Sequence, residues 1–139
     1  MSRYVFDSHA LIAYFREEPG ADRVEALVTD PGHERWLSVI SLGEVYYIAA
    51  KRTDMREDEV LSDVLSMPLA LVDASMMLVL EAAQVKAKYP LSYADCFAVA
   101  VAQRYDAAIV TGDPEFEQLE ANGEVQIEWL PPKPKKRSR

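Results

Sequence analysis

Cysteine and long apolar runs are the two features that the sequence has least of. The single cysteine, Cys96, excludes an internal disulfide bond and a CxxC metal site, which agrees with a reducing compartment. No apolar run approaches the roughly 20 residues that span a bilayer, and the chain begins without a signal-peptide pattern. We therefore expect a cytoplasmic protein with no membrane segment, in which Cys96 is a small buried hydrophobe.

Basic residues are scarce outside the last nine positions. The tail, residues 131–139 (PPKPKKRSR), holds five of the 15 Lys and Arg, so the rest of the chain has ten basic residues against 23 acidic ones. Such a body is poorly suited to bind nucleic acid by phosphate neutralisation alone, but it suits a protein that gathers divalent cations or docks a basic partner. We expect the Pro-rich tail to be disordered. It is either a solubilising or added end, or an arm that contacts phosphates or a partner.

Basic residues are also absent from three apolar runs that each contain one acid. The acids and their runs are Asp7 in residues 4–15, Glu44 in residues 36–50 and Asp95 in residues 89–103. A fourth acid, Asp113, follows the apolar run 107–110. Removing an unpaired carboxylate from water costs several kcal/mol or more, so each needs a partner. With no Lys or Arg nearby in the sequence, the pattern points to a metal ion.

Short apolar runs alternate with helical patterns along the chain. Strands are expected at residues 3–7, 36–40, 69–72, 107–110 and 125–130, and the helices between them are expected to be capped by Ser8, Ser41, Asp73 and Ser92. This alternation predicts one α/β domain over residues 1–130, a sandwich in which helices cover both faces of a parallel sheet of about five strands.

The four acids are expected to converge at one edge of this sheet. Asp7 and Asp113 follow carboxyl ends of strands, while Glu44 and Asp95 fall in first turns of helices that begin at the same edge. Ligands of open α/β sheets bind outside those ends. Helix amino termini favour negative charge, which we expect to keep the acids ionised. Oxygen ligands select hard cations such as Mg²⁺ or Mn²⁺.

Each acid also has a purely structural explanation. Asp7 and Asp113 could cap the helices that follow them, and Glu44 and Asp95 each lie three residues after a serine, as in a capping box. Capping explains any one acid, but it does not explain why four collect at one edge. Asp73, which also ends a strand and begins a helix, we interpret as a cap alone.

Several polar and aromatic residues near the four acids could have either a structural or a functional role. Ser8 and Thr111 carry short hydroxyls that could orient the acids, or could simply cap a helix and a turn. His9 lies two residues past Asp7 and is expected to turn away from it around the helix. Tyr46 and Tyr47 are expected to pack rather than to stack on bases.

Four segments together resemble a known family. They are residues 4–8 (YVFDS), 41–45 (SLGEV), 92–100 (SYADCFAVA) and 109–116 (IVTGDPEF). In this order and spacing the chain resembles PIN-domain nucleases, and VapC-type toxins of toxin-antitoxin pairs in particular, from Arg3 to about Leu130. The resemblance implies a three-layer α/β/α sandwich, Mg²⁺ or Mn²⁺, endoribonuclease activity, homodimers and inhibition by a VapB-like antitoxin. It also implies an acidic metal-binding set with one supporting hydroxyl, namely Asp7, Glu44, Asp95 and Asp113 with Thr111.

The resulting hypothesis is hydrolysis of RNA phosphodiesters by metal-activated water. Asp7 and Asp95 would be the core ligands, with Glu44 and Asp113 binding directly or through water. The alternatives are a housekeeping PIN nuclease, another metal-dependent phosphoesterase such as a phosphatase or DNA nuclease, and a catalytically silent PIN fold that acts as a binding module. An aspartyl-phosphate phosphatase would need a second acid of a DxD motif at position 9, where this chain has His9.

Overall fold

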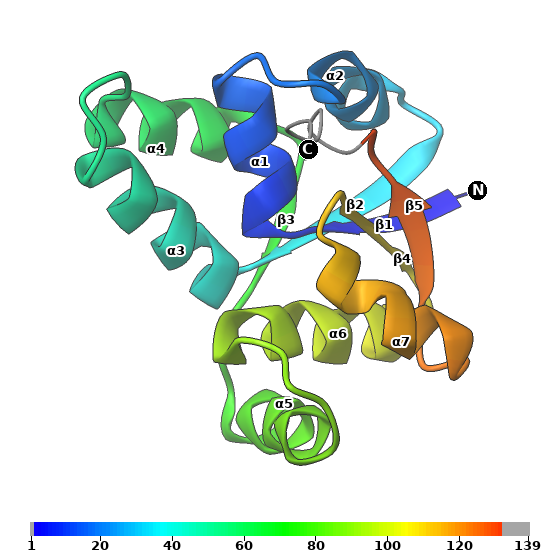
Figure 1. Ribbon diagram of the computed structural model, residues 1–139. Helices are drawn as coiled ribbons and strands as arrows, with labels where there is room; N and C mark the ends of the chain where they lie inside the picture. The colour runs from blue at the N-terminus through cyan, green and yellow to red at the C-terminus, as the bar shows by residue number, and fades with distance from the viewer. Residues whose placement is uncertain (1, 132–139) are drawn as a thin grey trace, which may run out of the picture.

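The computed structural model describes residues 2–131 and shows a central sheet with helices on both sides (Figure 1). The strands are β1 (Ser2–Phe6), β2 (His33–Ser38), β3 (Ala70–Val72), β4 (Ala108–Thr111) and β5 (Gln126–Trp129). The helices are α1 (Ser8–Phe15), α2 (Ala21–Thr29), α3 (Val39–Ala50), α4 (Glu57–Ser66), α5 (Met76–Lys88), α6 (Tyr93–Tyr105), the 3-10 helix η1 (Pro114–Phe116) and α7 (Glu117–Ala121). The disorder predicted for the tail concerns residues 132–139, which lie outside the described part.

The five strands form one parallel sheet in the order β3-β2-β1-β4-β5, which confirms the predicted architecture. In its centre β1 lies beside β4, with Tyr4 opposite Ala108 and Phe6 opposite Val110. The chain first extends the sheet on one side of β1 and then crosses to the other side. The crevice outside the carboxyl ends of β1 and β4 is therefore the switch point at which ligands of such sheets bind.

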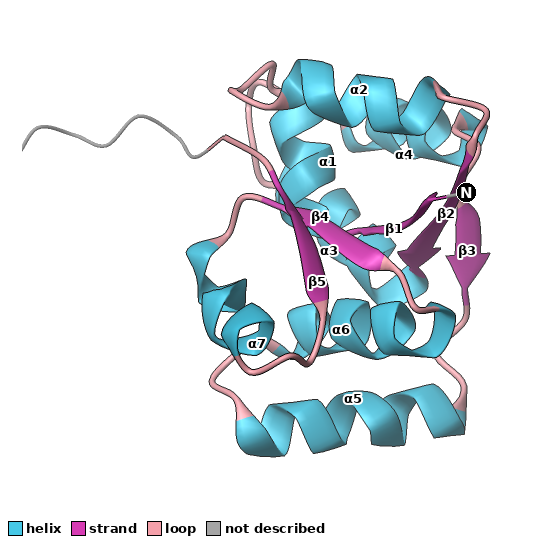
Figure 2. Cartoon of the chain, turned by 90° about the vertical axis from the view of Figure 1, so that its right-hand side faces the viewer, coloured by secondary structure: helices cyan, strands magenta, loops and turns pink. Residues whose placement is uncertain are grey.

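Two hydrophobic cores, one on each face of the sheet, hold the layers together. Neighbouring strand residues point to opposite faces, so Val5 belongs to the core under α5, α6 and α7, and Phe6 to the core under α1 to α4. Figure 2 shows α5, α6 and α7 below the sheet and α1, α2 and α4 above it. The predicted three-layer sandwich is confirmed. Cys96 is fully buried in the first core, as expected.

Two of the predicted caps next to the sheet are wrong. The α1 helix begins at Ser8 and its cap is Asp7, whose Oδ1 accepts a hydrogen bond from the amide of Ala10 at 2.8 Å. The α3 helix is capped by Ser38 and not by Ser41. Because Ser38 already turns the chain out of the sheet, part of the apolar run expected as strand is helical, and Glu44 lies in the second turn of α3.

Of the two remaining predicted caps, one is right and one is wrong. Ser92 caps α6 through its hydroxyl, which accepts from the amide of Asp95 at 3.2 Å, as predicted. Asp73 does not cap α5, because the helix begins three residues later and Ser75 accepts from the amide of Leu78. Asp73 therefore stands exposed between β3 and α5. None of the helices in the described part of the chain has the length and hydrophobicity needed to cross a membrane.

Candidate metal centre

Asp7 lies buried at the point where β1 gives way to α1. It directly follows the fully buried Val5 and Phe6 in the chain, and only 1% of its surface is exposed. Its Oδ1 makes the capping bond to the amide of Ala10. Its Oδ2 is buried and has no partner among residues 2–131 with ordinary hydrogen-bond geometry, although the Thr111 hydroxyl lies near enough to the carboxyl group to lower its pKa. Buried polar groups normally have a partner, so this oxygen calls for a ligand such as a cation.

Burial raises the pKa of Asp7 to about 8. The Thr111 hydroxyl and the Ala10 amide oppose this shift, and the negative charges of Asp95 and Asp113 add to it. The expectation that helix amino termini keep the acids ionised is thus wrong for Asp7, because desolvation outweighs its capping bond. A cation bound at Oδ2 would reverse the balance and restore the charged form.

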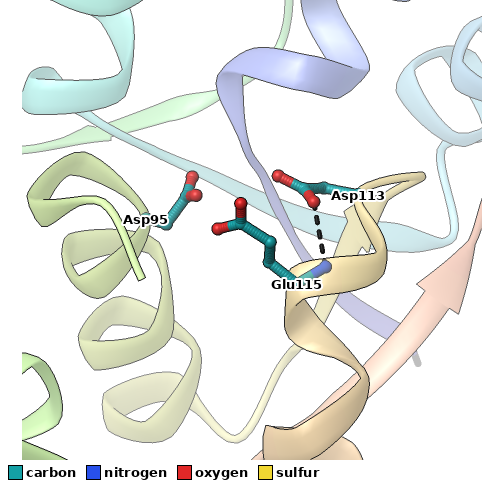
Figure 3. A group of neighbouring side chains, drawn as sticks. All are labelled: Asp95, Asp113 and Glu115. Atoms are coloured by element: carbon teal, nitrogen blue, oxygen red, sulfur yellow. Dashed lines mark hydrogen bonds between the residues drawn. The ribbon is translucent and has the colours of Figure 1, made fainter. Parts of the chain in front are cut away.

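Three further acids form a compact group at the same edge (Figure 3). One carboxylate oxygen each from Asp95, Asp113 and Glu115 lies within 4.8 Å of the other two. Asp95 comes from the first turn of α6, and the other two come from the segment after β4. Asp113 is the cap of η1, since its Oδ1 accepts from the amide of Glu115 at 2.9 Å. The cap and the candidate ligand are therefore the same residue, as at Asp7.

Asp95 is the acid that links the others electrostatically. Burial is the main cause that raises its pKa to about 6, and the Ser92 hydroxyl opposes the shift. The charges of Glu44, Asp113 and Glu115 raise it further. Since Asp95 also raises the pKa of Asp7, the structure brings all four predicted acids into one electrostatically coupled group. Their role as metal ligands stays a prediction.

Glu44 reaches this group from the second turn of α3 and is held at both oxygens. The Ser8 hydroxyl donates to Oε1, and the Tyr47 hydroxyl donates to Oε2 at 3.3 Å. The expectation that Tyr46 and Tyr47 pack inside is wrong, because their exposed fractions are 43% and 52%. A tyrosine that is free of the core can instead reach a carboxylate on its own helix.

Thr111 and His9 shape the loop that carries Asp113. The fully buried Thr111 accepts from the amide of Asp113 through Oγ1 at 3.1 Å. The His9 imidazole lies against Gly112, whose amide donates to Nδ1 at 3.4 Å. His9 thus lies beside the loop that carries Asp113, and its expected turn away from Asp7 stays a prediction.

No basic side chain in the described part of the chain forms an ion pair with this cluster. Within residues 2–131, none of the five acids makes an ion pair with Lys, Arg or His, whose ion pairs involve other acids. Carboxylates with no cationic side chain beside them repel one another unless a cation or protons intervene. An all-oxygen donor set of this kind fits Mg²⁺ or Mn²⁺.

Glu115 is the residue that the sequence analysis missed. It lies in the fourth resemblance segment, residues 109–116, but received no role there. The usable signal is the Asp113-Pro114-Glu115 sequence. Proline at the start of η1 favours the tight turn, in which the amide of Glu115 donates to Asp113 and the two acids lie close together.

Comparisons with known proteins agree with this fold. A solved VapBC2 structure from Rickettsia felis, bound to a DNA fragment from its promoter, superposes with a TM-score of 0.71 at 17% identity, over 93% of this chain and 99% of that chain. Mycobacterium tuberculosis VapC20, described as a sarcin-ricin loop cleaving toxin, gives 0.70 at 18% identity over 94% and 100%. DNA-bound VapBC from Salmonella typhimurium gives 0.68 at 20% identity over 92% and 98%. At these identities the likeness shows the fold alone.

Sequence comparison supplies the family. No curated protein matches the chain significantly. The family model of the PIN domain, however, matches residues 4–122, which is most of the chain and includes all five acids. The chain therefore belongs to the PIN domain family.

Proposed function

We propose that the protein is a divalent-metal-dependent endoribonuclease and the toxin of a VapBC-type toxin-antitoxin pair. The observation that carries the proposal is the buried Oδ2 of Asp7, which has no hydrogen-bond partner in the described part and belongs to an acidic group that forms no ion pair with the basic side chains of residues 2–131. Membership of the PIN domain family supports a nuclease. Mg²⁺ or Mn²⁺ is the cation that these oxygen donors suit.

Each acid has a distinct part in this proposal. Asp7 and Asp95 would be the core ligands, because they are the buried and half-buried members whose ionisation the protein alone disfavours. Asp113, Glu44 and Glu115 would complete the set directly or through water. When bound, the cation would lower the pKa of a coordinated water and stabilise negative charge on the phosphoryl oxygens. Ser8 and Thr111 would keep Glu44 and the Asp113 loop in place.

RNA is the proposed substrate class. The description of the structural neighbour VapC20 as a sarcin-ricin loop cleaving toxin supports this choice. The acidic body of the chain would repel a polyanion, so the cation has to reverse the local sign of the charge. The basic tail would supply further attraction. DNA cleavage, phosphatase activity and a silent binding module are the outcomes that would replace the proposal.

The proposed partners follow from the same neighbours. Several are VapB–VapC complexes, which supports a VapB-like antitoxin as the natural inhibitor. We further propose a homodimer in the cytoplasm, in which residues 1–130 are the nuclease domain and residues 131–139 a separate basic tail. Co-purification of the chain with a small DNA-binding protein encoded beside it would test the partner directly.

The activity is tested on a panel of labelled RNAs and on DNA of the same sequences. We expect RNA cleavage with Mg²⁺ or Mn²⁺, none in EDTA, and none for purified Asp7→Asn or Asp95→Asn. Asp73→Asn is the matched control, because Asp73 also follows a strand of this sheet but is exposed and lies outside the acidic group. Cleavage that survives both site substitutions would refute the metal assignment, and cleavage of DNA alone would refute the substrate class.

A further inference from the structure

We propose that His9 is a positioning residue that holds the loop carrying Asp113 against α1, and so sets where Asp113 meets the acid of α6. The inference rests on the proposed metal site and adds to it a residue that supplies no ligand. His9 is the second residue of α1 and is half-buried. Asp113 lies one residue beyond Gly112, between β4 and η1.

The contact between His9 and Gly112 leaves no room for a Cβ atom unless something shifts. The Gly112 amide donates to His9 Nδ1 at 3.4 Å. A Cβ atom added to Gly112 would lie 2.9 Å from His9 Cε1 and 3.5 Å from Nδ1. Since ordinary carbon contacts begin near 3.5 Å, alanine at position 112 would displace either the imidazole or the loop.

Space, and not backbone conformation, explains this glycine. The described glycines with positive φ are Gly20 and Gly123, and Gly112 is not among them. Alanine could therefore adopt the backbone conformation of Gly112, and the imidazole is the close obstacle. Gly43 offers the opposite case, because a Cβ there would meet nothing within 4 Å.

The loop is anchored from two sides. On one side the carbonyl of Thr111 accepts from the amide of Leu130 at 2.9 Å, and Oγ1 of Thr111 accepts from the amide of Asp113. On the other side His9 contacts Gly112. Without the imidazole, the backbone just before Asp113 would lose its contact with α1, and its carboxylate would be less precisely placed.

The start of α1, together with its cap, therefore serves three parts of the site. Asp7 offers its free Oδ2, Ser8 donates to Glu44, and His9 contacts the Asp113 loop. These successive residues connect the strand β1 to α3 and to the segment after β4. A substitution at His9 should accordingly lower the affinity for the cation, although the imidazole does not bind it.

The test measures Mn²⁺ affinity of the full chain by calorimetry, with thermal unfolding in EDTA to check each fold. We expect His9→Ala and Gly112→Ala each to weaken binding about tenfold, the lower range for changes that disturb how ligands are oriented. His9→Asn should recover most of the affinity, because Oδ1 of asparagine takes the place of Nδ1. The double variant should bind no more weakly than His9→Ala, and Gly43→Ala should bind like the wild type.

Three results would overturn the proposal. The first is that His9→Ala binds Mn²⁺ with wild-type affinity. The second is that Gly112→Ala weakens Mn²⁺ binding equally with and without the imidazole. The third is that His9→Asn binds Mn²⁺ as weakly as His9→Ala. If His9→Ala does not fold, the Gly112→Ala effect is compared in the wild-type and His9→Asn backgrounds, where the smaller side chain should reduce it. A wild-type chain that binds no Mn²⁺ would instead refute the proposed metal site, which separates the two failures.

Discussion

The hydroxyl of Ser8 donates a hydrogen bond to Oε1 of Glu44 and so joins the first residue of α1 to the second turn of α3. Ser8 is only 7% exposed, and the bond is partly buried. Hydrogen bonds to a charged acceptor in such surroundings are among the stronger ones. The orientation of Glu44 therefore depends on a residue that stands next to Asp7 in the sequence.

Replacing Ser8 with alanine should lower RNA cleavage about tenfold, because Glu44 loses the donor that orients it. Ser8→Thr retains a hydroxyl and should keep most of the activity. Initial cleavage rates at saturating Mg²⁺ measure the effect. An alanine variant as active as the wild type would show that Glu44 needs no such support.

Tyr47→Phe removes the second donor to Glu44 and should have a smaller effect, about two- to threefold, because an exposed hydrogen bond contributes on the order of 0.5 kcal/mol. Tyr46→Phe is the matched control. The two tyrosines are neighbours of similar exposure, but only Tyr47 reaches the carboxylate. The ratio of the two cleavage rates is the measurement, and equal rates would contradict a role for the Tyr47 hydroxyl.

Asp7→Asn should stabilise the metal-free protein at pH 8. The folded-state pKa of Asp7 is raised to about 8 from 3.8, so folding takes up a proton between these values and wild-type stability falls as the pH rises through this window. Asparagine removes that loss, a gain on the order of a few kcal/mol at pH 8. Urea unfolding in EDTA at pH 5 and pH 8 measures it. A wild type and variant with the same pH dependence would contradict the burial of an unpaired carboxylate.

Glu115→Gln tests the acid that the sequence analysis missed. The substitution leaves the backbone amide that bonds to Asp113, so η1 should keep its cap while the group loses one charge. We expect weaker Mn²⁺ binding and slower cleavage at limiting Mn²⁺, with thermal stability in EDTA unchanged or raised. Glu117→Gln, an exposed acid of the next helix, is the control. Identical Mn²⁺ titrations for the two variants would remove Glu115 from the site.

The fold could be predicted well because the apolar runs that form the sheet are short and nearly uncharged, and because turn residues separate the elements. The fully buried residues Val5, Ile109 and Val110 mark central strands by composition alone, and Pro19 with Gly20 marks the end of a helix. Helix starts were harder. A serine followed three residues later by an acid occurs at Ser41, but Ser38 at the end of β2 is the residue that leaves the sheet first.

Of the candidate site, the sequence predicts only those acids that stand out in apolar segments. Asp7 and Asp95 stand out because nothing else in their runs is charged. Glu115 does not, since an acid in a polar turn resembles any solvated side chain until η1 folds it back. The contact of His9 with Gly112 could not be predicted for a related reason: Gly112 lies far along the chain, and local periodicity carries no information about that loop.

The most direct test of the central claim is a Mn²⁺ titration of the purified full chain, beside its Asp95→Asn and Asp73→Asn variants. If the acids gather around a divalent cation, the wild type and Asp73→Asn bind Mn²⁺ with release of protons, because Asp7 and Asp95 must ionise. Asp95→Asn should then lose most of the affinity. Absence of binding by the wild type, or equal binding by all three proteins, would contradict the account.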